Sequence, residues 1–242
     1  MNITGEDRLL PLFLSRAVMS VTVGSPEAQR ALQLQHKIRL SDDPTAPLVY
    51  LVHGRAGNHD VMWAFRRCIP EACSIIAPQA PLPDNAGGFS WWDIGTTSAR
   101  EGSERAASIL LEFMNAAESF YRLKPRTRLA CGFSQGAGLL SAVIQREACF
   151  AGVGLLAGFV VETAPSNPLP RGPGGQPTAV FMAHGTDDEI VPVEKARAGR
   201  DHLLSYGFPV EYVEDPVGHK VGTGAMKALT RWFSSFELGI AP

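Results

Sequence analysis

The amino-acid sequence predicts an α/β fold, in which a mostly parallel β-sheet is flanked by helices on both faces. Short, continuously apolar runs at residues 48–52, 74–77 and 178–183 are typical of strands that are buried on both sides. Amphipathic segments long enough for helices separate these runs, and this alternation is typical of parallel sheets. Polar residues suited to chemistry follow the ends of several strands, where such sheets place their functional sites.

The composition excludes some classes of function. The chain has 242 residues, of which 45% are apolar and 19% charged, and its formal net charge is −2. These values are ordinary for a globular protein and provide no basic surface for nucleic acid or an anionic membrane. The length fits a single domain over residues 1–242, without a repeat or a linker. We therefore expect no nucleic-acid partner.

The cysteines and the N-terminal segment bear on the cellular location of the protein. Neither C-x-x-C spacing nor the density of a disulfide scaffold is present, so we expect reduced thiols and a cytoplasmic location. The apolar stretch at residues 9–14 is too short to span a membrane, and two acidic residues precede it. It lacks the basic start and cleavage site of a signal peptide, so we expect neither secretion nor stable membrane insertion. The cysteines are Cys68, Cys73, Cys131 and Cys149.

The first half of the chain contains the start of the predicted sheet. Residues 17–23 and 35–40 are β-rich and flank a Gly-Ser-Pro turn, which predicts an antiparallel pair of lead-in strands within residues 1–40. After the strand at 48–52, a helix begins near residue 61. The strand at 74–77 leads into a loop at 78–93, whose paired tryptophans favour an ordered conformation. Residues 99–123 carry an apolar stripe and predict a helix.

The second half continues the alternation. We predict strands at residues 152–157, 178–183 and 210–213, and helices at 138–146, 193–206 and 222–236. Residues 158–177 are irregular and rich in proline and glycine. They form either a cover over a binding site or an ordinary surface loop, and the sequence leaves both interpretations open.

A short glycine-flanked motif separates the apolar run before Gly132 from the helix that begins near residue 138. The segment Gly132-Phe133-Ser134-Gln135-Gly136 matches G-x-S-x-G, in which a serine occupies a sharp strand-to-helix turn. Glycine suits the outer positions because a Cβ there would collide with neighbouring chain. The turn also places the serine at a helix start, where free amides favour developing negative charge. Alone, the pattern also fits a tight turn that merely contains serine.

Two later residues strengthen the interpretation of this motif. Asp188 and His219 each follow a predicted strand, in the chain order serine, aspartate, histidine. A serine hydroxyl becomes a good nucleophile when a histidine takes its proton and a carboxylate orients that histidine. The pattern therefore predicts a catalytic triad of Ser134, Asp188 and His219. By strand position alone Asp187 is an equal candidate and Asp215, after the last strand, a weaker one, and His184 is the first alternative base.

With these residues in view, the chain resembles the phospholipase/carboxylesterase family of α/β-hydrolases, which includes bacterial carboxylesterases and acyl-protein thioesterases. The resemblance covers about residues 48–219 and implies an α/β-hydrolase fold. In the family's His-Gly-x-x-Asp pattern the matching carboxylate is Asp188, not Asp187. The matching segments are Leu51-Val52-His53-Gly54, Pro78-Gln79-Ala80-Pro81, Trp91-Trp92-Asp93, Gly132-Phe133-Ser134-Gln135-Gly136, His184-Gly185-Thr186-Asp187-Asp188 with Val191-Pro192, and Gly218-His219.

The resemblance also implies an oxyanion hole formed by the backbone N–H groups of Arg55 and Gln135. Donors fixed at a strand end and a helix start can meet an alkoxide without reorganising. Arg55 replaces a leucine that is common in the thioesterases, and its side chain could alter substrate preference or point into solvent. Phe89, Trp91 and Trp92 could line an acyl pocket or anchor the long loop.

We therefore predict a serine hydrolase that cleaves small carboxylic esters or thioesters through an acyl-enzyme, without a cofactor. The same triad would serve a lysophospholipase or an acyl-protein thioesterase, and a non-catalytic binding protein of this fold is the alternative from another class. The sequence also offers metal-ligating side chains at His53, His59, Asp60 and residues 187–189, but their spacing matches no zinc or two-metal pattern, so we predict no metal site. Because dimers occur in the family, a homodimer is an expectation.

Overall fold

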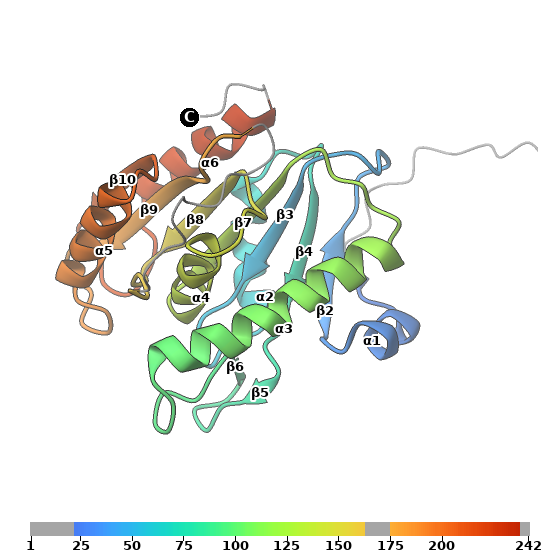
Figure 1. Ribbon diagram of the computed structural model, residues 1–242, viewed down its shortest axis with the longest axis horizontal. Coiled ribbons are helices and arrows are strands. Elements are labelled where there is room, and N and C mark those ends of the chain that lie inside the picture. The colour runs from blue at the N-terminus through green and yellow to red at the C-terminus, as the bar shows by residue number, and fades with distance from the viewer. Residues whose placement is uncertain (1–21, 163–174, 238–242) are drawn as a thin grey trace, which may run out of the picture.

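An eight-stranded sheet organises the residues that the computed structural model describes, 22–162 and 175–237 (Figure 1). Every neighbouring pair from β4 through β10 is parallel, whereas β2 is antiparallel to both β1 and β4. The mostly parallel sheet predicted from the sequence is thereby confirmed. In spatial order its strands are β1 (Thr22–Val23), β2 (His36–Arg39), β4 (Ser74–Pro78), β3 (Leu48–Val52), β7 (Arg128–Phe133), β8 (Gly152–Leu156), β9 (Ala179–Gly185) and β10 (Val210–Asp215).

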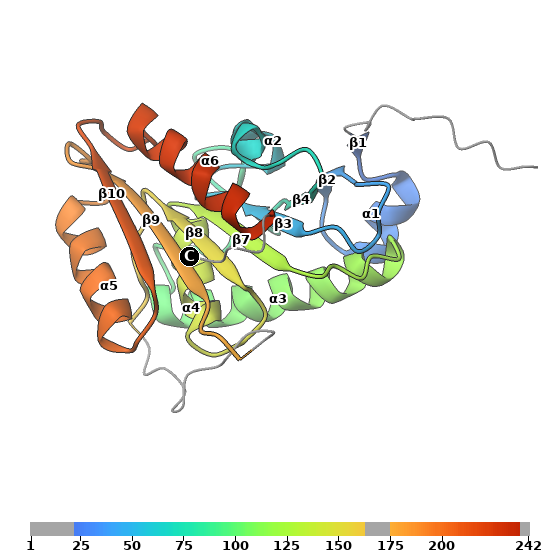
Figure 2. The same cartoon turned by 90° about the horizontal axis from the view of Figure 1, so that it is seen from above.

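Helices cover both faces of the sheet, as the view from above shows (Figure 2). One face carries α2 (His59–Met62), the short 3-10 helix η1 (Trp63–Cys68) and α6 (Thr223–Glu237). The other face carries α1 (Pro26–Leu32), α3 (Ala99–Phe120), α4 (Gln135–Ile144) and α5 (Val193–Ser205). Two apolar layers result, one between each set of helices and the sheet.

Strand β3 shows why the sheet needs cover on both sides. All five of its residues are buried. Tyr50 and Val52 belong to the apolar cluster under α3 and α4, while Val49 and Leu51 belong to the cluster under α2 and α6. Successive side chains of a strand point to opposite faces, so a continuous apolar run fills both layers at once. The run at residues 48–52 is therefore a central strand.

The N-terminal strand pair is present, but its connection differs from the prediction. Thr22 and Val23 pair antiparallel with Ile38 and Lys37, while residues 17–21 lie outside the described ranges. The connection is α1 and not a simple turn. Ser25 caps that helix, its Oγ accepting a backbone amide of the first turn at 3.1 Å, and a proline occupies the first helical position. The Gly-Ser-Pro sequence is thus a helix start.

The loop at residues 78–93 contains a small antiparallel hairpin, β5 (Leu82–Pro83) with β6 (Phe89–Ser90), at the bottom of Figure 1. It follows β4 and lies beyond the carboxyl ends of the parallel strands. Of the irregular segment predicted at residues 158–177, positions 163–174 lie outside the described residues. The hairpin borders the same edge of the sheet as the described loops that follow β3, β9 and β10.

Candidate active site

Ser134 occupies the turn between β7 and α4. Its φ of 52° and ψ of −113° lie in a region that costs a non-glycine residue about 1–3 kcal/mol. The Ser134 amide donates to the carbonyl of Leu156 in β8 at 2.8 Å, which holds the turn against the neighbouring strand. A Cβ at Gly132 would collide with the carbonyl of Gly136, and a Cβ at Gly136 would collide with that of Val52. Close backbone approach therefore requires both glycines of the motif.

His219 approaches Ser134 from the loop after β10. Its Nε2 lies 3.1 Å from Ser134 Oγ, and its ring packs against Phe133 with a centroid separation of 5.0 Å. The loop passes directly over the end of β9, because a Cβ at Gly185 would collide with the carbonyl of Val217. Backbone contact between these two segments thus brings the histidine within hydrogen-bond distance of the serine.

Asp188 lies behind His219, in the loop after β9. Its Oδ2 lies 2.7 Å from His219 Nδ1, and its Oδ1 accepts the amides of Ile190 and Val191 at 2.9 Å each. Burial alone would raise the pKa of Asp188, but hydrogen bonds from the Val191 amide, from His219 and from the Ile190 amide together hold that pKa below its usual value. The ionised carboxylate can accept from Nδ1–H, which leaves Nε2 as the acceptor of the ring.

The alternative residues have other partners. Asp187 is exposed and accepts from the hydroxyl of the preceding threonine at 3.0 Å. His184 is buried, with its Nε2 3.3 Å from Asp188 Oδ2 and 2.7 Å from a backbone carbonyl. Asp215 accepts an amide in the first turn of α6 at 2.8 Å. The structure therefore brings Asp188, and not its neighbour, into line with His219 and Ser134.

The expected oxyanion donors, Arg55 and Gln135, belong to segments next to Ser134. Gln135 is the first residue of α4, where the helix provides no acceptor for its amide. Arg55 follows Gly54, and a Cβ at Gly54 would lie only 3.1 Å from Ser134 Cβ. Neither amide forms a hydrogen bond within residues 22–162 and 175–237.

Trp91 and Trp92 are 2% and 3% exposed and belong to the apolar cluster under α3. Trp91 Nε1 donates to the carbonyl of His53 at 2.9 Å. The Gln135 side chain accepts from Trp91 N and donates to Trp92 O, both at 2.9 Å. Of the two roles left open, this burial favours the loop anchor, while Phe89 is only half-buried. Sequence reasoning missed the Gln135 clamp, since no local pattern links these positions.

A pocket of about 300 Å³ adjoins the turn that carries Arg55. Arg55 Nε donates to Asp84 Oδ2 at 3.1 Å, so the guanidinium, although 45% exposed, is tied to the β5–β6 hairpin. Asp84 was not among the residues predicted from the sequence, and its place between two prolines and a glycine pair was the available signal for a hairpin. The pocket is lined by Arg55, Leu82, Pro83, Asp84, Asn85, Ser90 and Asp93.

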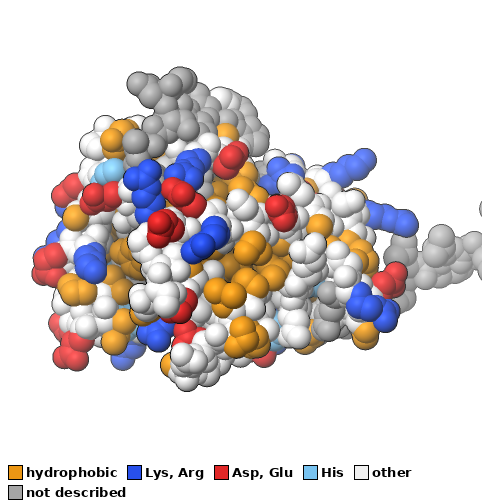
Figure 3. Space-filling view, turned by 60° about the horizontal axis from the view of Figure 1, so that its bottom comes forward, with side chains coloured by type: hydrophobic (Ala, Val, Ile, Leu, Met, Phe, Trp, Pro, Cys, Tyr) orange, Lys and Arg blue, Asp and Glu red, His pale blue; other side chains and the backbone are white. Residues whose placement is uncertain are grey.

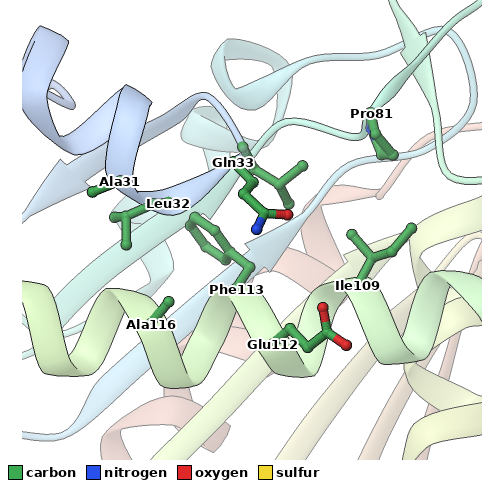
Figure 4. A pocket seen from close by; sticks show the side chains of 9 residues that line it. Ala31, Leu32, Gln33, Pro81, Ile109, Glu112, Phe113 and Ala116 are labelled. Atoms are coloured by element: carbon green, nitrogen blue, oxygen red, sulfur yellow. The ribbon is translucent and has the colours of Figure 1, made fainter.

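A second pocket, of about 200 Å³, lies between α1 and α3 (Figure 4). Leu32, Ile109 and Phe113 make much of its lining apolar, and Gln33 and Glu112 add polar groups. Figure 3 shows apolar side chains in the middle of one face of the molecule, with charged side chains mainly around them. Neither the serine, the aspartate nor the histidine of the candidate site lines this second pocket.

Further features of the described ranges bear on metals, membranes and thiols. Within residues 22–162 and 175–237, no group of three or more His, Cys, Asp or Glu side chains is placed to hold a metal ion. None of the helices in these ranges is long and apolar enough to cross a membrane. The four cysteines are free, and burial raises the pKa of the Cys131 thiol in β7.

The parallel sheet between two helical layers, with a serine on a strained strand-to-helix turn, defines an α/β-hydrolase fold. A family model described as Phospholipase/Carboxylesterase matches residues 34–235. The chain belongs to the phospholipase/carboxylesterase family, as the sequence motifs indicated.

Relatives within and around this family are distant in sequence. A probable carboxylesterase of Oryza sativa subsp. japonica is 26% identical over 177 residues, which cover 66% of this chain and only 63% of the rice protein. Esterase YpfH of Escherichia coli strain K12 is 24% identical over 200 residues, covering 78% of this chain and 83% of that protein. The crystal structure of the Bacillus cereus carboxylesterase gives a TM-score of 0.72 at 19% identity, covering 86% of this chain and 97% of that one. At this identity the structural likeness shows the fold.

Proposed function

We propose that this protein is a serine hydrolase that cleaves small carboxylic esters or thioesters through an acyl-enzyme. The observation that carries the proposal is the hydrogen-bonded chain from Asp188 through His219 to Ser134, at 2.7 and 3.1 Å. These are the separations that nucleophilic catalysis needs between a carboxylate, a base and a hydroxyl. Membership in the family and the names of the rice and E. coli relatives support ester substrates.

Ser134 is the nucleophile of the proposed reaction. As its Oγ bonds to the carbonyl carbon, the Oγ proton passes to His219 Nε2, while Asp188 accepts from Nδ1–H and stabilises the imidazolium. His219 then gives that proton to the departing alcohol or thiol, which leaves the acyl group on Ser134. A water molecule repeats the attack, with its proton again taken by His219, and releases the carboxylic acid and the free serine.

Arg55 and Gln135 would stabilise the tetrahedral intermediates of both steps. Their backbone amides form no hydrogen bond within the described residues, and one follows the end of β3 while the other begins α4. The negative charge develops on the former carbonyl oxygen, and donors that are already in place need no reorganisation when it appears. Loss of one such donor in an enzyme typically costs about 10²–10³ in kcat.

The proposal is tested by labelling the wild-type protein with a fluorophosphonate probe and by measuring turnover on a panel of esters of increasing acyl length beside one thioester. Labelling should occur at Ser134, and Ser134→Ala should lower kcat by about 10⁶ because the three residues act as a unit. Labelling that survives the substitution would contradict the assignment. Preference within the panel separates a small-ester esterase from a lysophospholipase or an acyl-protein thioesterase. The homodimer and the cytoplasmic location stay predictions from the sequence.

A further inference from the structure

The turn at residues 54–57 carries the proposed oxyanion donor of Arg55 and has an unfavourable conformation. Ala56 has a φ of 55°, in the left-handed region that disfavours residues with a Cβ. The turn also packs against the nucleophile, since a Cβ at Gly54 would lie 3.1 Å from Ser134 Cβ. A shift of this turn would therefore move the Arg55 amide relative to the reacting atoms.

The β5–β6 hairpin holds this turn from outside. Gly57 and Phe89 form two backbone hydrogen bonds, with Phe89 N donating at 2.8 Å and Gly57 N donating at 3.1 Å. A Cβ at Gly88 would collide with the carbonyl of Ala56, so the hairpin backbone lies directly on the turn. The conformation of the turn thus depends on where the hairpin sits.

Asp84 connects the hairpin to the turn through two routes. Its Oδ2 accepts from Arg55 Nε at 3.1 Å and from the Ser90 hydroxyl at 2.7 Å. Ser90 Oγ in turn accepts the amide of Ala56, the strained residue, at 3.0 Å. Asp84 Oδ1 accepts the amide of Ala86 at 2.9 Å and closes the hairpin. The hydrogen bonds from the Ala86 amide, from Ser90 and from Arg55 lower the pKa of Asp84, so the carboxylate stays ionised.

We propose that Asp84 is a positioning residue that sets the place of the oxyanion-hole amide of Arg55, acting through the Arg55 guanidinium and through Ser90. This inference rests on the proposed function. It also assigns a role to the arginine side chain: the guanidinium fixes the turn that its own backbone presents to the substrate. The hydrogen bonds of the carboxylate go to Arg55, Ser90 and the Ala86 amide and not to Ser134, so it acts through the two side chains it binds.

The substitution Asp84→Asn tests the proposal because it keeps the size of the side chain. With the amide oxygen kept on the Ala86 N–H, the amide nitrogen faces Ser90 and Arg55 and cannot accept from either. We expect kcat to fall about tenfold with KM changed less than twofold, since a displaced oxyanion donor weakens only transition-state binding. The affinity for a trifluoromethyl ketone, whose adduct with Ser134 places an oxyanion in the hole, should fall by the same factor.

Asp43→Asn is the matched control. Asp43 also closes a turn, accepting the Thr45 amide at 2.8 Å, and pairs with Arg126 at 3.5 Å, but it lies before β3, at the opposite edge of the sheet. It should leave kcat and ketone affinity unchanged. If Asp84→Asn does not fold, Ser90→Ala carries the same test, because it removes the acceptor of the Ala56 amide.

A double-mutant cycle on Arg55 and Asp84 supplies an independent test. In a cycle with Arg55→Leu, the double variant should lose no more kcat than the larger single loss, because Asp84→Asn already breaks the connection that Arg55→Leu removes. Unchanged kcat in Asp84→Asn, or a loss of kcat with undiminished ketone affinity, overturns the inference. If the wild type neither hydrolyses esters nor is labelled at Ser134, the proposed function fails and the inference fails with it. Wild-type turnover with a fully active Asp84 variant refutes the inference alone.

Discussion

Replacing Asp188 by asparagine should nearly silence hydrolysis while leaving the fold intact. The two side chains have the same size, so the change exchanges one acceptor oxygen for a donor NH₂ group. At Oδ1 two amides, those of Ile190 and Val191, donate at 2.9 Å each. At Oδ2 the closest contact is His219 Nδ1 at 2.7 Å, and His184 Nε2, whose proton goes to the Val191 carbonyl, lies farther away at 3.3 Å. The side-chain amide introduced at position 188 must therefore adopt one of two orientations.

The hydrogen-bond geometry decides that choice. With the NH₂ group at the Oδ1 site, two backbone N–H donors would face a third donor, so the oxygen stays there and the NH₂ group turns to His219. Nδ1 must then accept, the ring proton moves to Nε2, and Nε2 can no longer take the proton of Ser134. In the Ser-His-Asp enzymes this wrong tautomer costs on the order of 10⁴ in kcat, which is the loss we expect here.

Steady-state hydrolysis of a short-chain p-nitrophenyl ester measures this loss, with thermal unfolding of each variant as a check on folding. Asp187→Asn is the neighbouring control and should cost less than about tenfold, because its carboxylate is exposed and accepts from a threonine hydroxyl that an asparagine oxygen can also accept from. Asp215→Asn should also stay active, since an asparagine oxygen can still accept the amide that Asp215 binds in α6. A folded Asp188→Asn that keeps a tenth of wild-type kcat, or a silent Asp187→Asn, would refute the reasoning.

Three further outcomes follow from the same structure. His219→Gln should abolish most of the activity, because the glutamine side chain cannot take the Ser134 proton; a variant that stays active would indicate His184 as the base. Prolonged chelation should leave turnover unchanged, whereas a loss that one added metal restores would replace the serine mechanism by metal-assisted hydrolysis. Burial lowers the pKa of His53 from 6.5 to about 4. Between these two pH values the unfolded chain therefore binds more protons at this histidine than the folded protein does. The free energy of unfolding should therefore fall by about 3 kcal/mol as the pH drops across this range. Urea titrations should show that the free energy of unfolding depends less on pH in His53→Gln.

The strands and the serine turn could be predicted because their causes are local. A strand buried on both faces must be apolar throughout, so the apolar run at residues 48–52 is enough by itself to predict a buried strand. The glycines at 132 and 136 are required by contacts that every turn of this shape makes. Strand position predicted His219 and either Asp187 or Asp188, and the resemblance to the family pattern His-Gly-x-x-Asp selected Asp188. Their mutual distances follow from the fold and not from any one segment.

Other features depend on contacts between distant segments or on a local signal that admits two interpretations. Ser25 followed by proline begins either a turn or a helix, and α1 became certain only with its cap in place. The paired tryptophans fit a pocket wall as well as an anchor until Gln135 is seen to clamp them. The link from Asp84 through Ser90 to Ala56 joins three loop positions whose spacing has no period. Such contacts need three-dimensional information.

The distribution of the hydrogen-bonded chain over the sheet has a consequence for folding kinetics. Ser134 and His219 are 85 positions apart in the sequence, and Asp188 and His219 are 31 apart. The loops that hold them follow β7, β9 and β10, with β8 paired between the first two. Closing such separations carries an entropy cost that local helix formation does not, and parallel pairing is slow for this reason. During refolding, the return of hydrolysis therefore marks the completion of four neighbouring strands in register, well after the helical signal has recovered.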